Sequence, residues 1–179
     1  MWDTPAVVLI SGIMAAGKST VAELLARRLP RAVHLRGDVF RRMIVSGRAE
    51  MTAELGDEAW RQLRLRYDLA ASAADRYAAA GFTVVFQDVV LGPELPAVVD
   101  RIRHRPLAVV VLAPRADVVA ARERDRRKQG YGDWPVADLD AEFRAGTPRI
   151  GLWLDTSAQT PEETVDEILA RAWTAGRIG

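Results

Sequence analysis

A glycine-rich segment near the start of the chain constrains the fold more than any other feature. Residues 12–20 read G-I-M-A-A-G-K-S-T and fit the pattern G-x-x-x-x-G-K-[ST], which is typical of phosphate-binding P-loops. The apolar run at residues 6–10 indicates a buried strand before the segment. Apolar residues recur at helical spacing after it, at Val21, Leu24, Leu25 and Leu29. The motif therefore lies between a strand and a helix, which is the context that a P-loop requires.

The chemistry of phosphate binding explains this spacing. Backbone N–H groups in a loop of small residues can point inward around phosphate oxygens, and a helix that starts near Gly17 directs the positive end of its dipole at the same anion. Lys18 would reach the β- and γ-phosphates, and the Ser19 hydroxyl would ligate Mg²⁺. We therefore expect ATP, or another nucleoside triphosphate, and Mg²⁺ as cofactors. The loop residues expected to bind the nucleotide are Gly12, Ile13, Met14, Ala15, Ala16, Gly17, Lys18, Ser19 and Thr20.

Composition narrows the classes of function. The 179 residues carry 25 basic and 24 acidic side chains, for a net charge of +1, whereas nucleic-acid-binding domains usually have a strong basic excess. The chain has no cysteine, which excludes disulfides, thiolate chemistry and cysteine zinc sites. It has no long apolar run and no signal-like start, so we expect a soluble, cytoplasmic protein that does not contact membranes. Its length suits a single domain over residues 1–179.

Strand-like and helix-like segments alternate along the chain. Strands are predicted over about 6–11, 32–35, 82–86, 107–112 and 150–154. Helices are predicted over about 17–29, 38–47, 57–80, 93–103, 116–128 and 136–145, and from Pro161 onward after the N-cap Thr160. Apolar strands joined through helices predict an α/β fold with a parallel sheet covered on both faces. Ligands bind such sheets at the carboxyl ends of the strands.

The residues that follow the second predicted strand include an aspartate and an arginine. Asp38 stands after a glycine turn, where a carboxylate can accept the proton of an attacking hydroxyl while Lys18 and Mg²⁺ hold the γ-phosphate. Arg41 lies three residues further on and would bind a polar or anionic acceptor if the segment is helical. The alternative interpretation makes Asp38 a helix N-cap and Arg41 a solvated side chain.

A second carboxylate, Asp88, follows the third predicted strand. At this position it would hold a magnesium-bound water, a role that Asp38 could also fill. Asp88 could instead orient Arg41 or contact the acceptor, and the alternative is a cap at the start of a loop. Asp38, Arg41 and Asp88 are therefore the candidate acceptor-binding residues.

A strongly charged segment over about 116–128 is predicted to form part of a lid at about 115–135. Arg122 and Arg126 are four residues apart and share a helix face. If they face the nucleotide, both would stabilise charge on the transferred phosphoryl group, and Arg122 would also bind the nucleotide. Glycines at 130 and 132 would let the segment close. The alternative is a solvated helix. Residues 155–158, after the fifth strand, are expected to line the adenine pocket.

The long helix predicted over about 57–80 is amphipathic. Its apolar stripe consists of Trp60, Leu63, Tyr67, Ala70, Ala74 and Tyr77. Arg61, Arg64 and Arg66 are interpreted as a solvated face opposite the stripe, although a groove containing them would bind nucleic acid.

With these segments in place, the chain resembles P-loop kinases of the nucleoside-monophosphate-kinase-like superfamily over nearly its whole length. Residues 37–40 and 85–92 resemble segments of chloramphenicol phosphotransferases, where the aspartate of the first segment is catalytic. Asp38 and Arg41 match an Asp-x-x-Arg pair of polynucleotide 5′-kinases and related zeta-toxin/AAA_33-type proteins. In that group the pair acts as general base and acceptor-binding arginine, and Arg122 and Arg126 resemble the lid arginines. Adenylylsulfate kinases also show Gly-Asp-x-x-Arg at this place.

The resemblance implies a three-layer αβα sandwich with a five-stranded parallel sheet of order 2-3-1-4-5 and a helical lid. It also implies an ATP- and Mg²⁺-dependent kinase that phosphorylates a hydroxyl of a small molecule, such as an antibiotic. Val39, Phe40, Met43 and Met51 suggest an apolar wall that would suit a hydrophobic antibiotic. A polynucleotide 5′-hydroxyl kinase, with nucleic acid as partner, is the alternative, and a nucleotide-binding regulatory ATPase is a further one.

Overall fold

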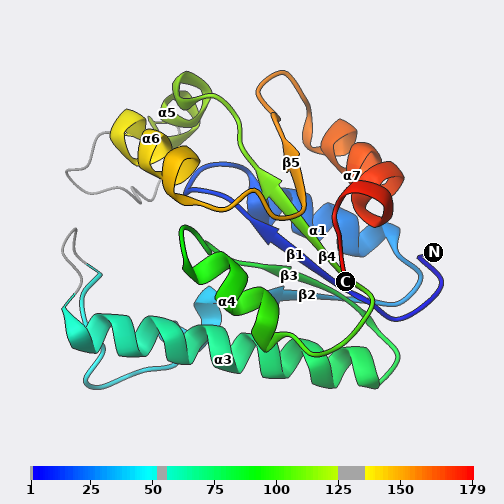
Figure 1. Cartoon of the computed structure of the whole chain (residues 1–179), viewed down its shortest axis with the longest axis horizontal. Coiled ribbons are helices and arrows are strands. Elements are labelled where there is room, and N and C mark those ends of the chain that lie inside the picture. The colour runs from blue at the N-terminus through cyan, green and yellow to red at the C-terminus, as the bar shows by residue number, and fades with distance from the viewer. Residues whose placement is uncertain (1, 52–55, 125–135) are drawn as a thin grey trace.

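A parallel sheet forms the centre of the protein in the computed structural model of the chain (Figure 1). The structure describes residues 2–51, 56–124 and 136–179. Five strands lie in the order β2-β3-β1-β4-β5, and each of their pairings is parallel. Their bounds are β1 Val7–Ser11, β2 Ala32–Arg36, β3 Thr83–Gln87, β4 Leu107–Leu112 and β5 Leu152–Leu154. The expected sheet and its strand order are confirmed.

A sixth strand, β6 Arg177–Ile178, pairs antiparallel with β4 and was not predicted. Two residues are too few to carry the alternating pattern by which a strand is recognised. This strand lies next to the amino-terminal half of β4, since Leu107 pairs with Ile178. It is therefore remote from the carboxyl ends of the parallel strands, where the candidate site residues lie.

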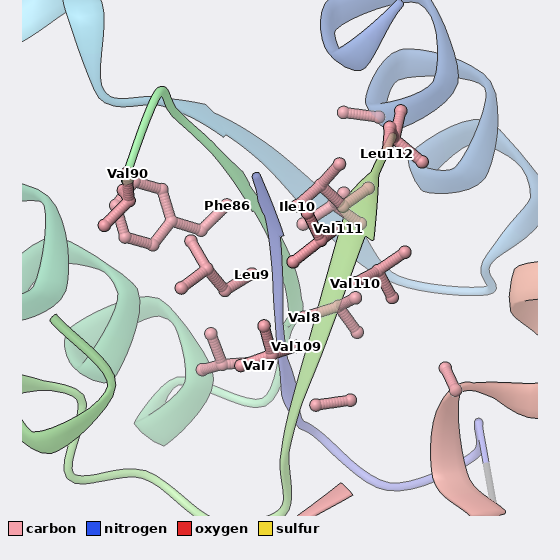
Figure 2. Close-up of a cluster of buried hydrophobic side chains, with 14 of the residues drawn as sticks. Val7, Val8, Leu9, Ile10, Phe86, Val90, Val109, Val110, Val111 and Leu112 are labelled. Atoms are coloured by element: carbon pink, nitrogen blue, oxygen red, sulfur yellow. The ribbon is translucent and has the colours of Figure 1, made fainter. Parts of the chain in front are cut away.

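Helices cover both faces of the sheet (Figure 1). Their bounds are α1 Lys18–Arg28, α2 Asp38–Arg42, α3 Asp57–Ala79, α4 Glu94–Arg101, α5 Ala116–Arg124, α6 Val136–Gly146 and α7 Pro161–Ala175. Helices α1 and α7 pack together, as do α3 and α4. Figure 2 shows Leu9 and Phe86 on the side of α3 and α4, and Ile10 and Val110 on the side of α1. Alternate side chains of each strand thus enter two different apolar layers, as expected for an αβα sandwich.

The central strands are buried because both faces of the sheet are covered. Every residue of β1, β3 and β4 is buried, in agreement with their continuous apolar runs. The predicted N-cap Thr160 is confirmed, and it forms a capping box with Glu163: Glu163 N donates to Thr160 Oγ1 at 3.1 Å, and Thr160 N donates to Glu163 Oε2 at 2.8 Å. None of the described helices is both long and apolar enough to cross a membrane.

One helix boundary and the burial of two residues were predicted wrongly. The helix predicted over 38–47 ends at Arg42, and Trp60 and Tyr77 of the apolar stripe are exposed at the surface of α3. The helix predicted over 116–128 is described as far as Arg124. The rest of the predicted lid, including Arg126 and the glycines at 130 and 132, lies outside the described residues.

Candidate active site

The loop between β1 and α1 has a backbone conformation that depends on its glycines. Gly12 has a φ of +143°, and a Cβ atom there would lie 2.4 Å from the carbonyl oxygen of Leu112. Gly17 is the N-cap of α1 with a φ of +96°, and Ala15 also has a positive φ of 59°. No side chain in the described part of the chain caps α1, so its first N–H groups point toward the loop. The strand–loop–helix context of a P-loop is confirmed.

The two polar side chains at the start of α1 are held at this loop. Lys18 is buried, and its Nζ donates to the carbonyl oxygen of Ile13 at 2.7 Å. Ser19 Oγ donates to Oε1 of Gln87, at the end of β3, at 3.3 Å. The uncapped helix start and the lysine fit a nucleoside triphosphate, and the hydroxyl beside an amide oxygen fits the hard oxygen donors that Mg²⁺ prefers.

Strand register brings the candidate residues to one edge of the sheet. In β2 and β3, Arg36 pairs with Gln87, and in β1 and β3, Ile10 pairs with Gln87. The residues after these strands therefore surround one cavity of about 540 Å³. The cavity is lined by Met14, Ala15, Gly17, Lys18, Ser19, Thr20, Arg36, Asp38, Arg42, Arg66, Gln87, Asp88, Val89 and Arg122. Of the residues predicted for the site, the P-loop residues Met14, Ala15, Gly17, Lys18, Ser19 and Thr20 line this cavity together with Asp38, Asp88 and Arg122. Arg36, Arg42, Arg66, Gln87 and Val89 line it without having been predicted.

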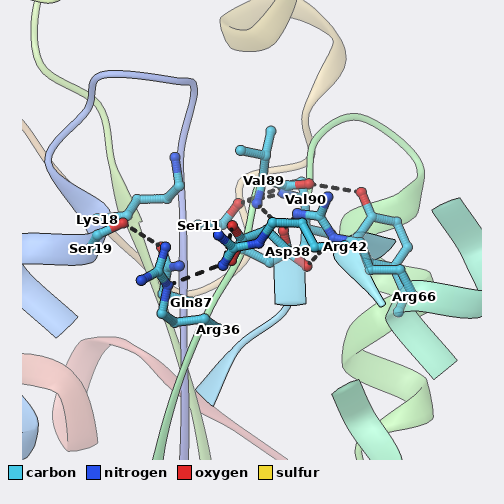
Figure 3. Close-up of polar contacts among 12 residues, drawn as sticks. Ser11, Lys18, Ser19, Arg36, Asp38, Arg42, Arg66, Gln87, Val89 and Val90 are labelled. Carbon is cyan, nitrogen blue, oxygen red and sulfur yellow. Dashed lines mark hydrogen bonds and ion pairs between the residues drawn. The ribbon is translucent and has the colours of Figure 1, made fainter. Parts of the chain in front are cut away.

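Asp38 lies between two arginines in this cavity (Figure 3). Its Oδ2 lies 3.1 Å from Nη2 of Arg42, and its Oδ1 lies 3.6 Å from Nε of Arg36. The latter distance is longer than a hydrogen bond, and Oδ1 makes no hydrogen bond within the described part of the chain. Gly37, not Asp38, is the N-cap of α2, so the interpretation of Asp38 as a helix cap is wrong.

Arg41 is not among the residues that line the cavity. Its Nη2 donates to the carbonyl oxygen of Ala49, in the segment between α2 and α3. The next residue, Arg42, faces Asp38 instead. The structure therefore brings Asp38 and Asp88 together at the cavity, but it does not bring Arg41 to them.

Asp88 is buried and is bound by Arg66 of α3. Arg66 Nε donates to Asp88 Oδ2 at 2.9 Å, and Arg66 Nη2 donates to Asp88 Oδ1. The backbone N–H of Val89 donates to the same Oδ1 at 2.7 Å. Both carboxylate oxygens therefore have donors, and the guanidinium partner of Asp88 is Arg66, not the expected Arg41.

The interpretation of Arg66 as a solvated side chain was wrong. Its side chain is 13% exposed, and burial lowers the pKa of its guanidinium. The sequence did contain a signal for this placement, because Arg66 stands three residues after Leu63 and four before Ala70, both of which are buried. It therefore lies on the edge of the apolar stripe and not opposite it.

The turn before Asp38 packs directly against the carboxylate of Asp88. A Cβ atom at Gly37 would lie 1.9 Å from Asp88 Oδ2. The N–H of Gly37 also donates to the carbonyl oxygen of Gln87 at 3.1 Å. Glycine at this position therefore allows the Arg66–Asp88 pair to support the turn that carries Asp38.

The loop after β3 is fixed by two further side chains. Ser11 Oγ donates to the carbonyl oxygen of Val90 at 2.6 Å and accepts from its N–H at 3.1 Å. Tyr67 donates its hydroxyl proton to the carbonyl oxygen of Val89 at 2.7 Å. Burial raises the pKa of Tyr67 to about 12. These contacts rigidify the backbone on either side of Asp88.

Arg122 of α5 reaches the P-loop. Its Nη1 donates to the carbonyl oxygen of Ala16 at 3.4 Å, and its Nη2 donates to that of Thr156 at 3.1 Å. It thus joins the P-loop to residues 155–158, which were predicted to line the adenine pocket. In that segment the hydroxyl and the N–H of Ser157 both donate to Asp155 Oδ1, the N–H at 3.0 Å. The bond from the hydroxyl is the main cause that lowers the pKa of Asp155.

Known structures share this fold. A sugar kinase from Janibacter sp. HTCC2649 is 21% identical over 93% of each chain, with a TM-score of 0.65. The APS kinase CysC of Mycobacterium tuberculosis, in complex with AMPPNP and APS, is 19% identical over 93% of this chain and 96% of that chain, with a TM-score of 0.67. The Deinococcus radiodurans tunicamycin resistance protein is 16% identical over 98% of this chain and 99% of that chain, with a TM-score of 0.67.

The parallel sheet of order 2-3-1-4-5 and the P-loop after its central strand define the fold of P-loop kinases. The chain belongs to the AAA_33 family, described as an AAA domain, whose model matches residues 7–172. No curated protein matches the chain.

Proposed function

We propose that this protein is an ATP- and Mg²⁺-dependent phosphotransferase whose acceptor is a hydroxyl of a small molecule. One observation carries the proposal: a single cavity is lined by both the P-loop and Asp38, and the carboxylate side chain of Asp38 is 37% exposed there. A general base must have an oxygen available for the proton of the acceptor hydroxyl. Two of the similar structures are kinases by name, which agrees with this assignment.

The residues of the cavity divide the work of phosphoryl transfer among them. The acceptor oxygen bonds to the γ-phosphorus while the bond from that phosphorus to the bridging oxygen of ADP breaks, and Asp38 takes the hydroxyl proton. Lys18 and Arg122 lie at the P-loop, where they would stabilise the charge of the γ-phosphoryl group and of the departing ADP. Arg126 would add to this from the predicted lid.

Mg²⁺ would be held by Ser19, with Gln87 as the partner for a metal-bound water. Gln87 Oε1 lies 3.3 Å from the Ser19 hydroxyl, whereas both oxygens of Asp88 already accept hydrogen bonds from Arg66 or Val89. When bound, the ion supplies neutralisation of phosphate charge. We therefore assign Asp88 a positioning role beneath Gly37 and Asp38 in place of a role at the metal.

The groove of Arg61, Arg64 and Arg66 gives little support to the polynucleotide 5′-kinase alternative. Arg61 pairs with Glu58, Arg64 with Glu94 and Arg66 with Asp88. Paired arginines attract phosphates far less than unpaired ones do, because the neighbouring carboxylate offsets the charge. We therefore rank a small-molecule acceptor first, with antibiotics, sugars and nucleosides as the classes to test.

The test is transfer of a radiolabelled γ-phosphate from ATP to a panel of antibiotics, sugars, nucleosides and a 5′-hydroxyl oligonucleotide. We expect label on a small molecule, with transfer lost in Lys18→Ala and Asp38→Asn. Asp166→Asn is the matched control, since this carboxylate is also paired with an arginine, Arg28 at 3.0 Å, but lies on α7 outside the cavity. Label on the oligonucleotide alone, or ATP hydrolysis that is equal in wild type and Asp38→Asn without transfer, would refute the proposal.

A further inference from the structure

We propose that the acceptor alcohol also carries an anionic group, which Arg36 and Arg42 bind beside Asp38. The group can be a carboxylate, a sulfate or a phosphate, since each of them presents at least two negatively charged oxygens that a guanidinium can bind at the same time. This inference rests on the proposed function, because it concerns the acceptor of the same cavity.

The charges of the cavity separate into three sets. Lys18 and Arg122 contact carbonyl oxygens of the P-loop, so a bound nucleoside triphosphate would take up their charge. Arg66 and Asp88 form a buried pair that is neutral as a whole. The remaining set is Arg36 and Arg42, which share the single carboxylate of Asp38. An excess positive charge therefore remains on the acceptor side after the nucleotide has bound.

This sharing is unusual among the arginines that the structure describes. Four arginines that do not line the cavity each pair with a different carboxylate. The pairs are Arg61–Glu58, Arg64–Glu94, Arg101–Asp68 and Arg144–Asp140. An arginine-rich composition alone would produce such one-to-one pairs. It does not explain two guanidinium groups on one carboxylate at the wall of a cavity.

Arg36 and Arg42 have donors to spare for a ligand. A guanidinium has five N–H donors in a planar fork, and only one nitrogen of each arginine defines its ion pair with Asp38, at 3.6 and 3.1 Å. Their side chains are 44% and 47% exposed and both line the cavity. An anion that binds them would hold the acceptor next to the Asp38 carboxylate, where the acceptor hydroxyl has to lose a proton.

The apolar wall expected for a hydrophobic antibiotic is not at this cavity. Val39, Phe40, Met43 and Met51 are absent from its lining, and Met43 is 65% exposed. The apolar side chains that do line it are Met14, Ala15 and Val89. The acceptor side is therefore mainly charged, and charged groups bind a complementary anion better than an apolar surface.

Matched acceptors test the inference in the enzyme assay. Each pair consists of a neutral alcohol and its anionic counterpart: a sugar and its sugar acid, a sugar and its phosphate, a nucleoside and its 5′-monophosphate, and an alcohol and its sulfated form. We expect the anionic member of at least one pair to have the lower KM, by about ten- to hundredfold. Arg42→Gln should raise that KM by a similar factor with little change in KM for ATP.

The control for Arg42→Gln is Arg61→Gln, which removes a guanidinium that is paired with Glu58 outside the cavity and should leave both KM values unchanged. If neutral alcohols are phosphorylated with KM values equal to or below those of their anionic partners, the inference fails while the proposed function stands. If no acceptor is labelled, the proposed function fails, and the sulfate-binding measurement below then tests anion binding by Arg36 and Arg42 separately.

A second test measures the binding of inorganic sulfate by calorimetry, with AMPPNP and Mg²⁺ at saturation. It does not depend on phosphoryl transfer. We expect wild type and Arg61→Gln to bind sulfate equally, and the double variant Arg36→Gln/Arg42→Gln to bind it at least tenfold more weakly. Equal binding by the double variant and wild type, or no binding by wild type, would overturn the inference. Circular dichroism and thermal unfolding verify that the double variant is folded.

Discussion

A single methyl group added at Gly37 probes the buried support of the candidate base. The φ of Gly37 is −62°, which alanine adopts without strain, so backbone conformation contributes little to the cost. The cost comes from Asp88, because the new Cβ would lie 1.9 Å from Oδ2 and real Cβ atoms essentially never approach within 3.0 Å of another atom. One of the two groups must therefore move by about 1.1 Å.

This movement should cost about 3 kcal/mol in the free energy of unfolding. Asp88 cannot retreat without losing bonds to Arg66 or to the N–H of Val89. Overpacking of a close-packed interior costs about 1–3 kcal/mol, and breaking a buried ion pair costs about 3–5 kcal/mol. Gly37→Ala should also lower kcat, because the same movement displaces Asp38.

Urea unfolding measures the stability change, provided that the m-value stays constant. Gly56→Ala is the matched control, since Gly56 is also a helix N-cap, with a φ of −67°, and a Cβ there would meet none of the described residues within 4 Å. We expect it to change stability by less than about 0.5 kcal/mol. In an Asp88→Ala background the Gly37→Ala cost should largely vanish, because the clashing oxygen is gone. A Gly37→Ala cost equal to that of Gly56→Ala would refute the proposed packing of Asp88 against the turn.

Three further predictions follow from single contacts. Ser11→Ala should lower the free energy of unfolding by about 1–3 kcal/mol in urea melts, because it removes both buried hydrogen bonds to Val90; no loss would show that these bonds are not needed. The folded-state pKa of Tyr67 is raised from 10.0 to about 12. The neutral side chain therefore contributes fully to the free energy of unfolding below pH 10. This contribution of roughly 3 kcal/mol is lost as the pH rises to about 12. Tyr67→Phe should remove that part of the pH dependence, and an unchanged slope would contradict the assignment. Gln87→Leu should raise the Mg²⁺ concentration needed for half-maximal AMPPNP binding by about ten- to hundredfold, and an unchanged midpoint would exclude Gln87 from the metal site.

The sequence predicted the P-loop side of the site well because its signals are local. The glycines, Lys18 and Ser19 stand in one continuous motif between a strand and a helix, and the structure has that strand and helix. Likewise, each buried strand is a continuous apolar run in the sequence, so the strands of the sheet could be predicted. The order of its strands came from the resemblance, since periodicity carries no information on which strands are neighbours.

The acceptor side was predicted less well because it depends on long-range packing. The Arg66–Asp88 pair joins α3 to the end of β3, and nothing in the local sequence states which residue meets Asp88. The Asp-x-x-Arg spacing favoured Arg41, but α2 is only five residues long. In this short helix Arg41 binds the Ala49 carbonyl and Arg42 faces Asp38.

The most direct test of the central claim is a single-turnover measurement of phosphoryl transfer with Asp38→Asn, at saturating ATP, Mg²⁺ and the acceptor found in the panel. If Asp38 is the general base, the rate of transfer should fall by about 10²–10⁴-fold while the affinity for ATP stays at the wild-type value, because the P-loop is intact. A transfer rate within about threefold of wild type would contradict the account, since loss of a general base has a much larger effect.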